Sequence, residues 1–132
     1  MIGLDTNVLV RMFAEDDKRQ RDAAASLLEG LKGSQKAFVN AVVLAELVWT
    51  LRRVYKFNRY QISAVLRKLS EHPKILLWDR DIVRDAAHLH LEEGSDVSDC
   101  VIALMNIAAG CSVTYTFDEE ASSSRGFALI GN

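Results

Sequence analysis

Short apolar runs alternate along this chain with longer segments in which apolar residues recur at helical spacing. The short runs cover residues 2–4, 37–39, 75–78, 112–115 and 128–130, and their length favours strands. Each longer segment starts near a residue type that caps helices well, and the expected caps are Thr6, Asp16 or Asp17, Asn40, Asn58, Asp81, and Ser95 or Asp96. Strands that alternate with helices predict an α/β fold, a three-layer α/β/α arrangement around a central, mostly parallel sheet of four to five strands.

The composition predicts one globular domain over residues 1–132. The chain is 49% hydrophobic, has a single proline, Pro73, and has no linker-like or repetitive segment. No apolar stretch is long enough to cross a membrane, and no basic segment precedes an apolar one at the N-terminus. We therefore expect a cytoplasmic protein that has no membrane partner.

Four acidic residues lie inside or at the end of apolar runs, where acids are least expected. They are Asp5, Glu46, Asp99 and Asp118, and no basic residue lies within four positions of any of them. Burying a carboxylate without a partner costs several kcal/mol, so a compensating group is expected. Asp5 and Asp118 each follow a predicted strand, and ligands of parallel sheets bind beyond the carboxyl ends of strands. Convergence of the four acids on one divalent metal site would account for all of them.

Each acid also has an ordinary structural explanation. Asp5 and Asp118 are typical turn or cap residues, and Asp96 with Asp99 is a complete helix-capping pair. Glu46 would then be a lone buried glutamate with a raised pKa, or the partner of a distant arginine. The residues alone leave both interpretations open.

Taken together and in order, these motifs resemble the PIN-domain family, and most closely the VapC-type toxins of toxin–antitoxin pairs. The resemblance extends over nearly the whole chain and is carried by Leu4–Arg11, Ala45–Leu47, Asp96–Asp99 with Ile102 and Ala103, and Thr114–Asp118. It implies an endoribonuclease that depends on Mg²⁺ or Mn²⁺ and hydrolyses phosphodiester bonds. It also implies a homodimer and a small cognate antitoxin, whose C-terminal segment enters the active-site groove.

The resemblance assigns roles to residues of this chain. Asp5, Asp99 and Asp118 are expected to hold the main metal ion, with Glu46 as a further ligand or as a base that orients water. The residues expected to support them are Thr6, Asn7, Asp96 and Thr116. Carboxylates without histidine or cysteine suit hard cations rather than zinc. The chain departs from similar toxins at Glu119 and Glu120, where basic residues are common, and this departure weakens phosphate contacts on that side.

Basic residues concentrate in one acid-free stretch between Leu47 and Ser70. This basic strip consists of Arg52, Arg53, Lys56, Arg59, Arg67 and Lys68, with Tyr55, Phe57 and Tyr60 among them. Such a strip suits the phosphates and bases of RNA, but an ordinary solvated helix face has the same pattern. Arg11 has two similar interpretations. It either contacts RNA or an antitoxin, or it forms an ion pair with Glu15, Asp16 or Asp17.

Other function classes fit less well. A phosphatase with a nucleophilic aspartate needs a second aspartate two residues after Asp5, where this chain has Asn7, and a phosphorelay receiver needs a late lysine, whereas none follows Lys74. Cys100 and Cys111 are predicted to be reduced thiols in or near the core, and His88 and His90 to be surface or partly packed residues. The remaining alternative is a PIN-like module that binds RNA or assembles with partners but has weak or no catalytic activity.

Overall fold

The computed structural model describes residues 1–131 and has the predicted alternation of strands and helices. The strands are β1 Ile2–Gly3, β2 Ala37–Val39, β3 Ile75–Leu77, β4 Thr114–Thr116 and β5 Phe127–Leu129. The helices are α1 Thr6–Phe13, α2 Lys18–Glu29, α3 Ala41–Arg53, α4 Arg59–Glu71, α5 Arg80–Glu93, α6 Val97–Ala108 and α7 Glu119–Ser122. The α/β class is confirmed.

All strand pairings are parallel, as predicted, but the strands form two sheets. One sheet has the order β1-β2-β3, with Ile2 opposite Ala37 and Ala37 opposite Ile75, and the other consists of β4 and β5. A single sheet of four to five strands was expected. Strand β1 has only two residues and offers a very short hydrogen-bonding edge to a further strand, and Tyr115 of β4 stays exposed to solvent.

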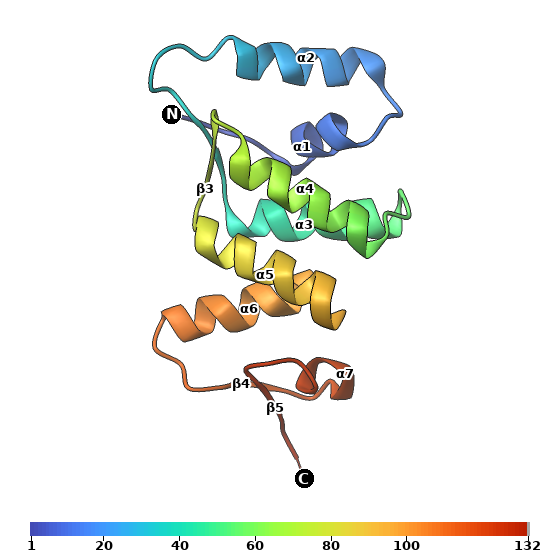
Figure 1. Cartoon of the computed structure of the whole chain (residues 1–132), viewed down its shortest axis with the longest axis vertical. Coiled ribbons are helices and arrows are strands. Elements are labelled where there is room, and N and C mark those ends of the chain that lie inside the picture. The colour runs from blue at the N-terminus through green and yellow to red at the C-terminus, as the bar shows by residue number, and fades with distance from the viewer. Residues whose placement is uncertain (132) are drawn as a thin grey trace.

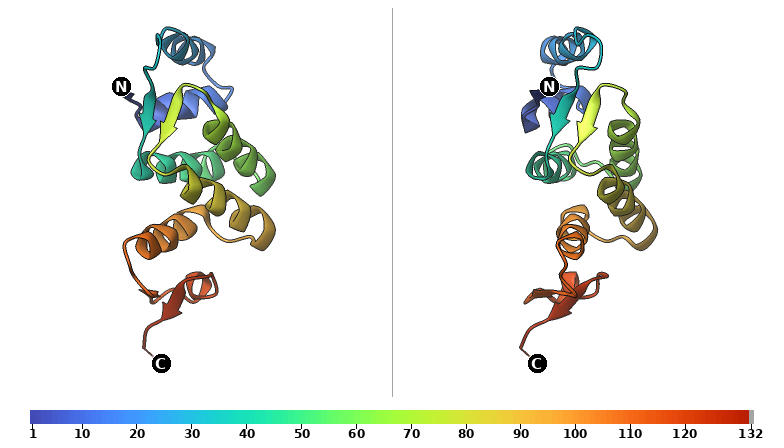
Figure 2. Two further views of the ribbon diagram at one scale, coloured as in Figure 1. Left: turned by 60° about the vertical axis from the view of Figure 1, so that its left-hand side comes forward. Right: turned by 90° about the vertical axis from the view of Figure 1, so that its left-hand side faces the viewer.

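The molecule is elongated, with the two sheets far apart (Figure 1). Helix α2 and the N-terminus lie at one end, and β4, β5 and α7 lie at the other, beyond α6. In the side view, α4 and α5 cover one side of the three-stranded sheet, while α1 and α3 lie on the other (Figure 2). Helix α6 packs on both α5 and α3, so it connects the two ends of the molecule.

The hydrophobic core belongs to the three-stranded sheet and its helices. Its largest fully buried side chains on α1, α3 and α4 are Leu9, Leu44, Leu47, Leu51, Ile62, Leu66 and Leu69. In the segment that contains β4, α7 and β5, Ala121 is the one buried hydrophobic residue among the described positions. This C-terminal segment therefore depends on its contacts with α6. Asn106 Nδ2 donates to Thr114 Oγ1 at 2.9 Å, and Gly126 lies so close to Ala103 that an added Cβ would be 3.3 Å from the Ala103 side chain.

Most helix starts agree with the predicted caps, and two differ by one or two residues. Asp17, Asn40, Asn58 and Asp96 cap α2, α3, α4 and α6. Asp5 rather than Thr6 caps α1, and Asp79 rather than Asp81 caps α5, since in each case the earlier carboxylate accepts the N–H bond. Helix α7 was not predicted, because its residues were interpreted as a turn.

Two further expectations need correction. Cys111 is exposed, whereas Cys100 is buried as predicted, and both thiols are free. His90 is almost completely buried rather than partly packed, because its Nδ1–H donates to the Ser95 carbonyl oxygen at 2.7 Å and the ring packs inside. Over residues 1–131, no helix has the length and apolar character needed to cross a membrane.

Candidate active site

One group of candidate residues lies where β1 ends and α1 begins. Asp5 caps α1 and accepts a hydrogen bond from the Thr6 N–H at 2.8 Å. The Thr6 hydroxyl donates to Glu46 Oε1 of α3 at 3.0 Å and so joins two helices that are distant in the sequence. We call Asp5, Thr6 and Glu46 the N-terminal half-site. It places two carboxylates beside the C-terminal end of β1, as the sequence predicts.

A second group lies at the start of α6 and the end of β4. Asp96 caps α6 by accepting from the Asp99 N–H at 3.0 Å, so the two acids are held on one helical turn. Thr116 Oγ1 accepts from the Asp118 N–H at 3.0 Å, and Asp118 in turn caps α7. We call Asp96, Asp99, Thr116 and Asp118 the C-terminal half-site.

Negative charge accumulates around Asp99. Partial burial is the main cause that raises the pKa of Asp99, and the charges of Asp96, Asp118 and Glu120 raise it further. The last three carboxylates therefore lie near enough to Asp99 for their charges to act on it. Such a cluster favours the binding of a cation or the uptake of a proton.

The hydrogen bonds of these acids leave coordinating atoms free. Within residues 1–131, Asp5, Asp96 and Asp118 each accept through Oδ1 alone, and Glu46 accepts through Oε1 alone. Each of these carboxylates therefore keeps a second oxygen that can bind a ligand while the first fixes the side chain. Supporting bonds of this kind orient ligands at metal sites.

The donor chemistry fits a hard divalent cation, but the spacing does not. Carboxylate oxygens are the ligands that Mg²⁺ and Mn²⁺ prefer. Among residues 1–131, however, no three acidic, histidine or cysteine side chains are close enough to share an ion. The structure brings Glu46 to Thr6 and Asp118 to the surroundings of Asp99, but it does not join the two half-sites into the expected cluster.

The expected burial of the acids is wrong for three of the four. Asp5, Glu46 and Asp118 are exposed, and Asp99 is half-buried. Glu46 was expected inside the core because apolar residues surround it in the sequence. Two of those neighbours, Val42 and Trp49, are themselves 68% and 58% exposed, since they share the solvent face of α3 with Glu46. No compensation for burial is therefore needed at Glu46.

Arg11 forms an ion pair with Asp16, which is one of the two roles that the sequence allowed for it. Its Nη1 donates to Asp16 Oδ1 at 2.9 Å and to the Tyr55 hydroxyl at 3.1 Å, and its Nε donates to Gln20. This network ties α1 to α2 and to the end of α3. Asn7, expected to support the acids, instead lines a groove between α1 and α2 together with Arg11 and Gln20.

The basic strip is exposed, but only part of its aromatic character is available. Arg52, Arg53, Lys56 and Arg59 are all exposed. Tyr55 is engaged with Arg11 and Asp16, and Phe57 packs against the core, whereas Tyr60 is 63% exposed beneath the Arg59 guanidinium at 5.3 Å. The strip therefore offers cations and one accessible tyrosine ring.

Sequence reasoning missed Trp49, and it named Glu120 only as a departure from similar toxins and not as a residue beside the acids. Trp49 and Glu120 both line a groove between α3 and the start of α6, which Arg52, Arg53, Asp96 and Ser98 also line. The position of Trp49 could have been found from its spacing, because it is three residues after Glu46 and shares a helical face with it. The place of Glu120 in this groove could not be predicted, since it depends on α7.

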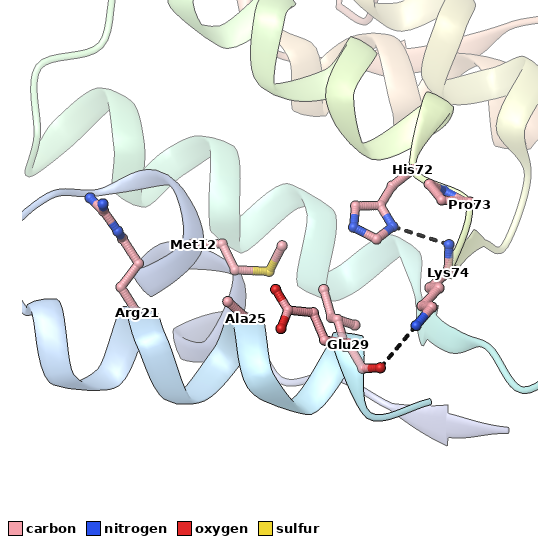
Figure 3. Close-up of a pocket in the computed structure, with 8 residues that line it drawn as sticks. Met12, Arg21, Ala25, Glu29, His72, Pro73 and Lys74 are labelled. Atoms are coloured by element: carbon pink, nitrogen blue, oxygen red, sulfur yellow. Dashed lines mark hydrogen bonds between the residues drawn. The ribbon is translucent and has the colours of Figure 1, made fainter. Parts of the chain in front are cut away.

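A separate cavity of about 370 Å³ lies between α2 and the start of β3, and none of the candidate acids line it (Figure 3). Lys74 and His72 in its lining have structural partners. Lys74 Nζ donates to the carbonyl oxygens of Glu29 and Leu31 near the end of α2, and the Lys74 N–H donates to His72 Nδ1. We interpret this cavity as a space left where α2 packs against the segment before β3, with a structural rather than a catalytic role.

Comparison with known proteins agrees with the motifs. The sequence profile of the PIN domain family matches residues 2–125, a span that contains every candidate site residue. None of the curated proteins compared with the chain matches it.

Proposed function

The chain belongs to the PIN domain family, whose members are generally nucleases, and on that premise we propose that it is an endoribonuclease dependent on Mg²⁺ or Mn²⁺. The observation that carries the proposal is that Asp96, Asp99 and Glu120 line one pocket. Partial burial there, and after it the charges of Asp96, Asp118 and Glu120, raise the pKa of the Asp99 carboxyl. Carboxylates that lie close together favour the uptake of a cation or a proton.

The two half-sites supply complementary parts of this proposed site. Asp99 provides oxygens at the start of α6 and Asp118 just after the end of β4, and Asp5 and Glu46 provide oxygens at the end of β1 and on α3. A bound divalent ion would neutralise charge on the phosphate and lower the pKa of a water molecule. The arrangement described requires the half-sites to approach each other before one ion can contact both.

The residues that support the acids have positioning roles in this proposal. Thr6 fixes the Glu46 carboxylate through its hydroxyl, and Thr116 fixes the backbone of Asp118. Asp96 holds the first turn of α6 and so sets the direction of Asp99. These bonds keep the negatively charged groups in place while substrate is absent.

The test is cleavage of total cellular RNA by the purified protein with Mg²⁺ or Mn²⁺ and with EDTA. We expect a few discrete products that are lost in EDTA and in Asp99→Asn. The matched control is Asp22→Asn on α2, which removes an equal charge from an exposed ion pair with Lys18 and should cleave normally. Asp99→Asn protein that cleaves like wild type would refute the proposal.

The separation of the half-sites favours one alternative, a PIN-like RNA-binding or assembly module without catalysis. That function needs no shared metal ion, and none of the described groups of side chains forms such a site. RNA that binds to well-folded protein in Mg²⁺ or Mn²⁺ without being cut would support this alternative and overturn the enzyme.

We further propose that the protein is the toxin of a toxin–antitoxin pair, forms a homodimer and is inhibited by a small antitoxin. The support is the resemblance of the motifs to VapC-type toxins. Induced expression in bacteria should stop growth, Asp99→Asn should not, and coexpression of a neighbouring small reading frame should restore growth. Growth that continues while active nuclease accumulates would contradict the toxin role.

A further inference from the structure

One exposed face of α3 leads from the N-terminal half-site to the basic strip. Glu46, Trp49 and Arg53 follow one another at spacings of three and four residues, so they line one side of the helix. All three are exposed, and Trp49 is 58% exposed although it is the largest apolar side chain of the helix. An acid, a flat aromatic ring and a cation thus lie in sequence along one surface.

Trp49 lies in a groove whose two walls carry opposite charge. Arg52 and Arg53 come with Trp49 from α3, and Asp96 and Glu120 come from the starts of α6 and α7. The groove has a volume of about 350 Å³, which is within the range of sites that take a small ligand. It borders the C-terminal half-site through Asp96, so a ligand in it would reach the candidate acids.

The cations of this groove are available to a ligand. Neither Arg52 nor Arg53 belongs to any of the salt bridges formed within residues 1–131. A guanidinium presents several donors in a fixed plane and binds phosphate oxygens in pairs. The adjoining indole presents a flat apolar surface on which any nucleobase can stack.

We propose that this groove is a subsite for one nucleotide of single-stranded RNA, with its base stacked on Trp49 and an adjacent phosphate bound by Arg52 and Arg53. The inference rests on the proposed function for its substrate class, and it names where that substrate is held. A base can stack on the ring only when it is free of a duplex, so the subsite selects loops or unpaired segments. The acids on the opposite wall keep the phosphate on the arginine side by repulsion.

The test uses the two tryptophans of the chain, Trp49 and Trp78, as separate reporters. Fluorescence is titrated with a short single-stranded oligoribonucleotide in EDTA, so that no cleavage occurs. In Trp78→Phe protein, which keeps only Trp49, we expect strong quenching, and in Trp49→Phe protein we expect almost none. Equal quenching in the two variants would overturn the proposal.

Affinity separates stacking from charge. Trp49→Ala should raise the Kd for the oligonucleotide by about 10-fold to 100-fold, while Trp49→Phe keeps a ring and should stay close to wild type. The double variant Arg52→Gln, Arg53→Gln should weaken binding at low salt and differ little at high salt. Unchanged affinity in Trp49→Ala would overturn the proposal, and because Trp49 is exposed the variant is expected to fold, which a thermal melt confirms.

The same protein distinguishes the other outcomes. If Trp49 instead packs against a second copy of the chain, its fluorescence will change with protein concentration alone. Trp49→Ala protein will then sediment more as a monomer than wild-type protein does. That result would overturn the RNA subsite. If RNA quenches the fluorescence of wild-type protein but is never cleaved, the subsite is supported and the nuclease activity is refuted. If Trp49→Ala protein binds and cleaves RNA normally, the nuclease activity is supported and the subsite is refuted.

Discussion

The two half-sites are built in different ways from the same kind of residue. In the N-terminal half-site, a tertiary hydrogen bond joins Thr6 of α1 to Glu46 of α3, two residues that are 40 positions apart in the sequence. In the C-terminal half-site, the bonds of Asp96 and Asp118 are local helix caps, and partial burial, followed by the charges of the neighbouring carboxylates, raises the pKa of Asp99. The first group is therefore fixed by packing, and the second is fixed by helix starts under electrostatic repulsion.

This difference predicts how firmly the surrounding core holds each half-site in place. Helices α1 and α3 contribute buried leucines to the core, so the position of Glu46 is as stable as the domain. The β4–β5 pair has few buried side chains among the described residues and is tied to α6 by a few contacts. Segments with few buried apolar contacts open at lower free energy than the core. A movement of the C-terminal segment would therefore displace Asp118, while Asp99 on α6 and Glu46 on α3 stay with the packed core.

The largest effect expected is on catalysis, from Glu46. Glu46→Gln removes a carboxylate that accepts the Thr6 hydroxyl bond, and loss of an acid–base or ligand group should lower kcat by about 100-fold to 10,000-fold. Thr6→Val keeps Glu46 but removes its fixed orientation, so we expect a smaller loss of about 10-fold. The matched control is Glu71→Gln at the exposed end of α4, which should cleave as wild type does. Rates for Thr6→Val below those of Glu46→Gln would contradict the positioning role.

Metal binding tests whether the half-sites share an ion. Saturating Mg²⁺ or Mn²⁺, at about 100 times its Kd, should stabilise the protein by about 2.7 kcal/mol and raise Tm by roughly 5–10 °C. Loss of this shift in both Asp5→Asn and Asp99→Asn would mean that one ion contacts both halves. Loss in Asp99→Asn alone would restrict the ion to the C-terminal half-site. Differential scanning fluorimetry with Ca²⁺-free buffer and an EDTA control is sufficient, and no shift in wild type would contradict a metal site.

Much of the fold follows from the sequence because local signals decide it. The caps at Asp17, Asn40, Asn58 and Asp96 were predicted, since each side chain bonds to the N–H of its own first turn. The ends of the strands were predicted to within two residues, because each strand is a short apolar run between helices whose starts are marked by caps. Local chemistry is readable from neighbouring residues.

The remaining features depend on tertiary packing that neighbouring residues do not specify. The exposure of Glu46 depends on which face of α3 packs inward. The sequence did not reveal that face, because Val42 and Trp49 are apolar and yet lie on the exposed face with Glu46. The full burial of His90 depends on the turn that brings the Ser95 carbonyl oxygen to its ring. The pairing of β4 with β5, apart from the three-stranded sheet, joins residues that no local pattern links to one sheet or the other. Each of these required the three-dimensional arrangement.

A smaller effect separates the two kinds of cap. Asp96→Ala removes the bond to the Asp99 N–H at the start of a twelve-residue helix and should cost about 1 kcal/mol of unfolding free energy. Asp5→Ala removes only a bond to the adjacent Thr6 N–H, a position that does not cap the second or third helical N–H, so we expect about half that loss or less. Urea unfolding measures both, with Asp96→Asn as the control that keeps the cap. Equal losses would remove the distinction between the half-sites.

The smallest effect is electrostatic and has a defined sign. The pKa of Asp99 is raised, so at neutral pH its charge is less favourable in the folded protein than in the unfolded one. Asp99→Asn should therefore stabilise the metal-free protein at pH 7, by less than about 1 kcal/mol because solvent screens the neighbouring acids. As the pH falls through the raised pKa and then below the ordinary value of 3.8, Asp99 is protonated in both states and the advantage of the variant disappears. Urea unfolding in EDTA at pH 7 and at pH 3.5 measures this change. Asp99→Asn protein that is less stable than wild type at pH 7 would show that the carboxylate is compensated by a partner, and the C-terminal half-site would then lack the repulsion that distinguishes it from the N-terminal one.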